Sequence, residues 1–178
     1  PVAAGQLVPV DDINLGRMTL QGDANASGAN YASFAFQVKD NGGTANGGAD
    51  LDPTPNLITI SLTQVNDAPF GANSSASIAT NGVLVLTTGL FQLSDPSDTP
   101  ANALGGIVIT SLPNSGTLKF NGADISAAQA AAGFSVTAAQ IVAGQLTYAA
   151  PAGATNVSFA FKVRDNGGTA NGGSDLAA

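Results

Sequence analysis

The side chains of this chain that could do chemistry are carboxylates of one kind. All twelve acidic residues are Asp, and the sequence contains no Glu, His or Cys. Zinc, haem, iron–sulfur and thiol sites rely on His or Cys, and a Ser–His–Asp triad needs His, so these are excluded. Asp is short, favours turns and places a hard oxygen close to the backbone. Because most of these residues stand beside Gly, Asn or Pro, we expect them in loops.

Two of these carboxylates, Asp95 and Asp98, are spaced closely enough to share acid–base work. The sequence offers them no Glu, His or Cys as a helper, and it contains no Trp. The only tyrosines are Tyr31 and Tyr148, so an aromatic platform for a sugar or another substrate is also lacking. We therefore expect a protein that is not an enzyme.

The charge of the chain restricts its partners. The formal net charge is -7, the isoelectric point is about 4.1, and only five residues are Lys or Arg. Five scattered cations cannot form the basic stripe that nucleic-acid binding needs.

At 44% hydrophobic residues the chain is too apolar for a disordered acidic tail. It has no run of about 18 apolar residues, so we expect no membrane insertion.

An internal repeat organises the sequence. Residues 34–51 return almost unchanged as residues 159–176, an offset of 125. Upstream, residues 13–20 match residues 141–148 at an offset of 128. The difference of three residues falls in a loop rich in Gly, Ala and Asn, where changes of length cost little. Self-similarity at a fixed period is the signature of tandem repeats.

The repeat predicts the domain organisation. Residues 1–65 correspond to the C-terminal part of one repeat, residues 66–69 to a linker, and residues 70–178 to the next repeat. Nothing after Leu176 matches residues 57–65. The second repeat is therefore expected to lack its last strand.

Alternating apolar and polar residues predict an all-β fold. The alternation is clear in residues 34–38, in their copy at 157–163, and in residues 58–62. A period of two indicates strands of an antiparallel sheet with one buried face. Further strands are expected at 83–88, 106–111, 116–120 and 145–149. Many short strands separated by turn signals indicate an antiparallel β-sandwich.

Local signals predict one hairpin and two short helices. Asn121-Gly122 suits a type I′ turn, which needs positive φ at both central residues. Residues 126–133 could form a helix with Ser126 as N-cap and Gly133 beyond its end. Thr137-Ala-Ala-Gln140 has the pattern of a capping box that opens another single turn.

Three motifs together cover nearly the whole chain. They are Gln64-Val-Asn-Asp-Ala-Pro69, the early segment 91–118 with its Asp95-Pro-Ser-Asp98 turn, and the Asp-Asn-Gly-Gly-Thr loops at 40–44 and 165–169. In combination they resemble the linker, the early part and the late part of cadherin-like repeats in giant bacterial surface proteins. The resemblance implies immunoglobulin-like sandwiches strung in many copies on secreted adhesins and fibres.

The resemblance also implies a cofactor, because members of that family typically bind Ca²⁺ where one repeat joins the next. Carried over by position, it points to six ligands: Asn66 and Asp67 of the linker, Asp95, Asp98 and Asn102 of the second unit, and Asp40 of the first. Ca²⁺ takes oxygen ligands from carboxylates, amides and backbone carbonyls, which this set supplies. The alternative is that these residues only form turns by bonding to their own backbone.

We expect a structural spacer of a long bacterial extracellular or cell-surface adhesin or fibre, stiffened by Ca²⁺ at the joint between repeats. Its partners would be neighbouring repeats of the same protein. An alternative is a filament in which residues 57–65 of one copy complete the open sheet edge of another by strand addition. A further alternative is a module that binds an adhesion ligand.

Overall fold

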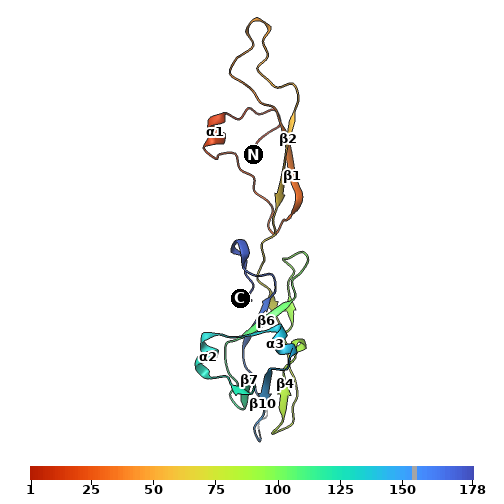
Figure 1. Cartoon of the computed structure of the whole chain (residues 1–178), viewed down its shortest axis with the longest axis vertical. Helices are drawn as coiled ribbons and strands as arrows, with labels where there is room; N and C mark the ends of the chain where they lie inside the picture. Colours follow the sequence, from red (N-terminus) through yellow and green to blue (C-terminus); the bar gives the residue numbers. More distant parts are fainter. Residues whose placement is uncertain (154–155) are drawn as a thin grey trace. The chain divides into compact units, whose positions relative to one another are not determined.

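The computed structural model describes residues 1–153 and 156–178, which divide into two compact units, Pro1–Gln64 and Val65–Ala178. Figure 1 shows α1, β1 and β2 in the first unit and most of the other strands in the second. Residues 66–69, expected as a linker, are part of the second unit.

The second unit is built from antiparallel sheets. Among the described residues, a four-stranded sheet has the order β4 (Val83–Val85), β10 (Leu146–Ala149), β7 (Thr117–Phe120) and β8 (Ala123–Asp124). A three-stranded sheet has the order β11 (Phe161–Asp165), β6 (Leu104–Ile109) and β9 (Phe134–Thr137). Two short strands, β3 (Phe70–Gly71) and β5 (Leu93–Ser94), form a separate pair. Every strand pair is antiparallel, and the all-β prediction is confirmed.

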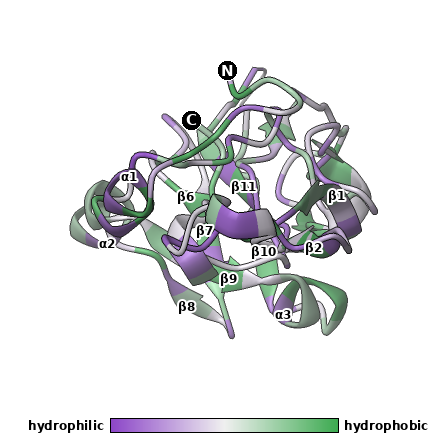
Figure 2. Cartoon of the chain, turned by 90° about the horizontal axis from the view of Figure 1, so that it is seen from above, coloured by the Kyte–Doolittle hydropathy of each residue, from purple (hydrophilic) through white to green (hydrophobic). Residues whose placement is uncertain are grey.

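Both larger sheets contribute to one hydrophobic core. Leu118 and Leu146 come from the four-stranded sheet, and Ile107, Val136 and Val163 from the three-stranded sheet; all five are fully buried. Figure 2, coloured by hydropathy, shows green apolar and purple polar segments following one another along the chain. Burial of such a side chain contributes roughly 1.5–3 kcal/mol, so this core stabilises the second unit.

The short helices begin where the sequence predicts. The helix α2 (Ala127–Ala132) has a capping box formed by Ser126 and Gln129, and α3 (Ala138–Val142) has one formed by Thr137 and Gln140. Each box satisfies backbone N–H groups that the first helical turn leaves unpaired. The hairpin between β7 and β8 is also confirmed, with positive φ at Asn121 and Gly122. No helix in the described ranges has the length and apolar character needed to cross a bilayer.

The first unit contains α1 (Val10–Asn14), β1 (Gly28–Phe36), the 3-10 turn η1 (Ala45–Gly47) and β2 (Asn56–Leu62). At the offset of 128 residues, α1 corresponds to α3. Strands β1 and β2 form a two-stranded antiparallel sheet in which Phe34 lies opposite Ile58.

Equivalent apolar positions of the two units differ greatly in burial. Ile13 is 51% exposed whereas its counterpart Ile141 is 1% exposed, and Val38 is 58% exposed whereas Val163 is fully buried. Residues 1–64 contain no strands corresponding to β6, β7 and β9 to cover these side chains. Among residues 1–64, β1 and β2 pair with each other and with no third strand.

Some strands differ from the expectation. Strand β9 and the pair β3–β5 were not predicted, because their apolar residues are too few to show a period. Strand β4 ends at Val85, before the predicted end at 88, since the 3-10 turn η2 (Thr88–Leu90) follows closely. Residues 157–160 belong to no regular strand, although Val157 and Phe159 are half-buried and Ser158 and Ala160 are exposed, as the alternation predicts.

Candidate functional site

Three carboxylates are buried at one end of β11. Asp95, Asp98 and Asp165 are 4%, 4% and 3% exposed, and they are the buried charged residues of the described part of the chain. Asp95 directly follows β5, and Asp98 lies three residues beyond Asp95. Asp165 is the last residue of β11. Buried ionised carboxylates are costly unless they are paired, hydrogen-bonded or bound to a cation. Their burial together therefore requires an explanation.

Two asparagines tie the three segments together. Nδ2 of Asn66 donates to Oδ1 of Asp165 at 3.0 Å, and the backbone N–H of Asn102 donates to Oδ2 of Asp95 at 2.9 Å. Nδ2 of Asn102 donates to Oδ1 of Asn66 and, at 3.3 Å, to Oδ2 of Asp98. The backbone N–H of Asp67 also donates to Oδ2 of Asp98, at 3.1 Å. Residues distant in sequence are thus joined in one polar network, which we call the aspartate cluster: Asn66, Asp67, Asp95, Asp98, Asn102 and Asp165.

The cluster holds more negative charge than its hydrogen bonds neutralise. Burial raises the pKa of Asp95, and the negative charges of Asp98 and Asp165 raise it further, against the opposing effect of the Asn102 N–H. Oδ1 of Asp95 and Oδ2 of Asp165 are buried and accept no hydrogen bond. The salt bridges found among the described residues include neither Asp95 nor Asp165. Each of these two carboxylates therefore has one buried oxygen without a hydrogen-bond partner.

The loop 165–175 holds Asn66 in place. Besides Asp165, Nδ2 of Asn66 reaches the carbonyl oxygens of Gly168 at 3.0 Å and Ser174 at 2.8 Å, while the Asn66 carbonyl accepts from the Ser174 N–H at 2.9 Å. Gly167 lies so close to Asn66 that a Cβ atom there would clash with its Oδ1. A residue larger than Gly cannot occupy this position unless Asn66 moves.

The loop 40–50 of the first unit has the same internal conformation. Its Gly42 N–H donates to Oδ1 of Asp40 at 2.7 Å, and the Gly167 N–H donates to Oδ1 of Asp165 at 2.8 Å. Asn46 and Asn171 both have positive φ, 53° and 55°, a conformation that Asn tolerates better than most residues. The repeat in sequence is therefore also a repeat in backbone geometry.

Five of the six residues that the resemblance implied lie in the aspartate cluster, although Asp67 participates through its backbone N–H. Asp40 lies in the first unit and is exposed. Its counterpart in the second unit, Asp165, is the residue that joins the cluster, and the sequence interpretation missed it. The signal was present in the 125-residue offset, which places Asp165 in the same repeat as Asp95 and Asp98.

The chemistry of the cluster fits a hard cation. Ca²⁺ takes about six to eight oxygen ligands, and carboxylates and amide oxygens are among those it prefers. Asp95, Asp98 and Asp165 could thus hold it with the two Asn side chains.

The side chains are not arranged as a formed metal centre. Across residues 1–153 and 156–178, no group of three or more acidic side chains has the spacing of a metal-binding group. A cation would have to draw the carboxylates closer together. Oδ1 of Asp95 and Oδ2 of Asp165, which have no hydrogen-bond partner, would then gain a cation as their ligand partner.

Comparison with protein families, with curated proteins and with solved structures finds no match to this chain.

Proposed function

We propose that this chain is a structural module of a long bacterial extracellular or cell-surface fibre or adhesin, built from immunoglobulin-like (cadherin-like) repeats. It acts as a stiff spacer, and Ca²⁺ held by Asp95, Asp98 and Asp165 rigidifies the start of each repeat. The observation that carries the proposal is the aspartate cluster, in which buried carboxylates meet with two oxygens unpartnered.

The position of the cluster supports a role in stiffness. Asn66 and Asp67 belong to it, and only three residues, Thr63 to Val65, separate Asn66 from the end of β2. An ion that fixes Asn66 and Asp67 therefore leaves a very short connection free to bend. The remaining partners of the module would be neighbouring repeats of the same protein.

The weak preorganisation of the site supports an extracellular setting. Extracellular Ca²⁺ modules bind with Kd of about 10⁻⁴–10⁻³ M, which suits a site that must first draw its carboxylates together. The net charge of -7 adds self-repulsion that a bound divalent cation lowers. Both points agree with the family resemblance of the linker and loop motifs.

Thermal unfolding of the whole chain with millimolar Ca²⁺ and with chelator tests this proposal. A ligand that binds only the folded state must raise its stability, so we expect a higher Tm in Ca²⁺. Mg²⁺ at the same concentration is the matched control, because it demands a tighter octahedral site and dehydrates reluctantly. An identical Tm in Ca²⁺ and chelator would overturn the calcium site.

A further inference from the structure

A β-bulge lies in β6 beside the aspartate cluster. Residues 161–164 of β11 pair in regular register with residues 109–106 of β6, but the next residue, Asp165, pairs with Leu104. Gly105 is therefore an extra residue without a counterpart in β11. A Cβ atom at Gly105 would clash with the carbonyl group of Asp165, so the bulge needs a residue without a side chain. Bulges re-aim side chains and are frequent beside functional sites.

The bulge decides which side chains of β6 share a face with Asp165. Directly opposed residues lie on one face of a sheet, and successive side chains of a strand point to opposite faces. Asp165 is opposite Leu104, so Asn102, two residues before Leu104, lies on the face of Asp165. In an unbroken register Asp165 would be opposite Gly105, and Ala103 would take that face in place of Asn102. The shift by one residue thus turns Asn102 towards the cluster.

Asn166 holds the shifted register in place. Its backbone N–H donates to the carbonyl oxygen of Ala103 at 3.0 Å, and its Oδ1 accepts from the Ala103 N–H at 2.9 Å. The side-chain oxygen therefore accepts the bond that a backbone carbonyl accepts in a regular antiparallel pair. Asn102 directly precedes Ala103, and Asp165 directly precedes Asn166. The two bonds therefore fix the two cluster residues relative to each other.

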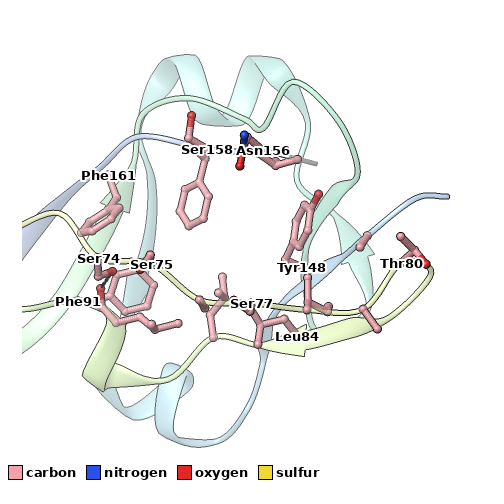
Figure 3. A pocket seen from close by; sticks show the side chains of 18 residues that line it. Ser74, Ser75, Ser77, Thr80, Leu84, Phe91, Tyr148, Asn156, Ser158 and Phe161 are labelled. Carbon is pink, nitrogen blue, oxygen red and sulfur yellow. Dashed lines mark hydrogen bonds between the residues drawn. The ribbon is translucent and has the colours of Figure 1, made fainter. Parts of the chain in front are cut away.

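The core brings another segment of the cluster to β11. The rings of Phe91 and Phe161 meet edge to face, with centroids 5.0 Å apart, where both line an open pocket (Figure 3). Each ring stands four residues before a cluster carboxylate, Phe91 before Asp95 and Phe161 before Asp165. Phe91 is 2% exposed, so the contact belongs to the core. Core packing thus joins the segments of Asp95 and Asp165, and the bulge adds Asn102.

We propose that the bulge at Gly105 and the side chain of Asn166 position Asn102 and Asp165 for the cation. This inference rests on the proposed cation site. Asn166 is a positioning residue rather than a ligand, because its Oδ1 accepts the Ala103 N–H. Without the shifted register Asn102 would face away, and its side chain would lose its bonds within the cluster.

A double-mutant cycle in chelator tests the positioning without Ca²⁺. Asn102→Ala removes the side-chain bonds to Asn66 and Asp98 and should lower the midpoint of urea unfolding of the whole chain. In an Asn166→Ala background the same replacement should lower the midpoint by less than half as much. Asn41→Ala is the matched background, because Asn41 has the same position in the identical loop of the first unit and is exposed. Additive shifts in the Asn166→Ala background would overturn the proposal.

Deletion of Gly105 tests the bulge itself. Loss of the extra residue restores a regular register and places Ala103, which is now exposed, on the face of the cluster. Ala103→Cys reports this turn, since the chain has no Cys of its own. Thiol labelling should be at least tenfold slower after the deletion, and equal rates in the two folded chains would refute the role of the bulge. If the deletion prevents folding, the double-mutant cycle decides the proposal.

Calorimetric titration with Ca²⁺ tests the consequence for binding. Asn166→Ala should raise the Kd at least fivefold, whereas Asn41→Ala should leave it unchanged. An unchanged Kd in Asn166→Ala would contradict the positioning role. If the parent chain binds no Ca²⁺, the proposed function fails, and the cycle in chelator alone decides whether Asn166 positions Asn102.

Discussion

Replacing Asp95 by Asn should change stability in opposite directions with and without Ca²⁺. Asp95 is buried, one of its oxygens is unpartnered, and its pKa is raised above the usual 3.8, first by burial and then by Asp98 and Asp165. In chelator, burial and the neighbouring carboxylates of Asp98 and Asp165 disfavour the ionised form of Asp95 in the folded state. An Asn side chain has no charge and can still accept the Asn102 N–H. The variant should therefore be more stable than the parent chain when no cation is present.

The expected magnitudes are large enough to measure. An unsatisfied buried polar group costs about 1–3 kcal/mol, so relief of that order is expected in chelator. Ca²⁺ at 100 times its Kd stabilises the parent chain by about 2.7 kcal/mol, which for a unit of this size raises Tm by roughly 10 °C. Asp95→Asn removes a ligand and should lose most of that rise. If the relief in chelator is below about 2.7 kcal/mol, the order of the two proteins in Tm reverses between the two buffers.

The pH dependence in chelator has a definite sign. Because the pKa of Asp95 is higher in the folded state than in the unfolded state, folding favours its protonated form. This contribution to stability is fully present below pH 3.8 and is lost as the pH rises through the raised folded pKa. Asp95→Asn should abolish this part of the decline.

Calorimetry or circular dichroism of the whole chain provides the assay, because the absence of Trp rules out tryptophan fluorescence. Asp124→Asn is the control, since its side chain is 65% exposed and belongs to the same unit but not to the cluster. If Asp95→Asn shifted Tm equally in Ca²⁺ and chelator, the carboxylate would not be a cation ligand, and the explanation of its burial would be wrong.

Three further predictions use contrasts within the chain. Asp165→Asn should reduce the rise of Tm in Ca²⁺, whereas Asp40→Asn at the equivalent position should leave it unchanged; a loss in both would assign Asp40 to the site as well. Gly167→Ala should lower the free energy of unfolding by roughly 1–3 kcal/mol because its Cβ meets Asn66, while Gly42→Ala, whose nearest contact is 3.2 Å, should cost much less by urea unfolding. Ser126→Ala should cost about 1 kcal/mol through loss of the N-cap, measured by the same urea titration; no change would mean that α2 is held by packing alone.

Local signals predicted the short elements well. Ser126, Thr137 and Asn121-Gly122 act within a few residues of themselves, through capping bonds and positive φ, so their structure follows from the neighbouring sequence. The alternation in residues 157–163 predicted the less exposed positions 157, 159 and 163, whereas Phe161 and Lys162 are both half-buried. Strand β9 escaped prediction because its few apolar residues show no period, and its pairing with β6 joins residues far apart in the chain.

The aspartate cluster shows where sequence reasoning stops. The motifs identified Asn66, Asp95, Asp98 and Asn102, but the resemblance suggested Asp40 as their companion, and Asp165 was overlooked. The two positions carry nearly identical sequence, so no local feature separates them. Asp165 is buried at the end of β11, which pairs with β6, whereas Asp40 is exposed in a unit whose described sheet has two strands.

The sequence by itself determined the all-β class, the 125-residue repeat and the conformation of its loops, because periodicity, turn residues and capping act over short distances. Only the tertiary structure decided which copy of a repeated residue is buried and which carboxylates meet. Those outcomes depend on which strands lie beside each segment. Segments 40–48 and 165–173 have identical sequences. The sequence of either segment therefore carries no information about the strands that pack against it.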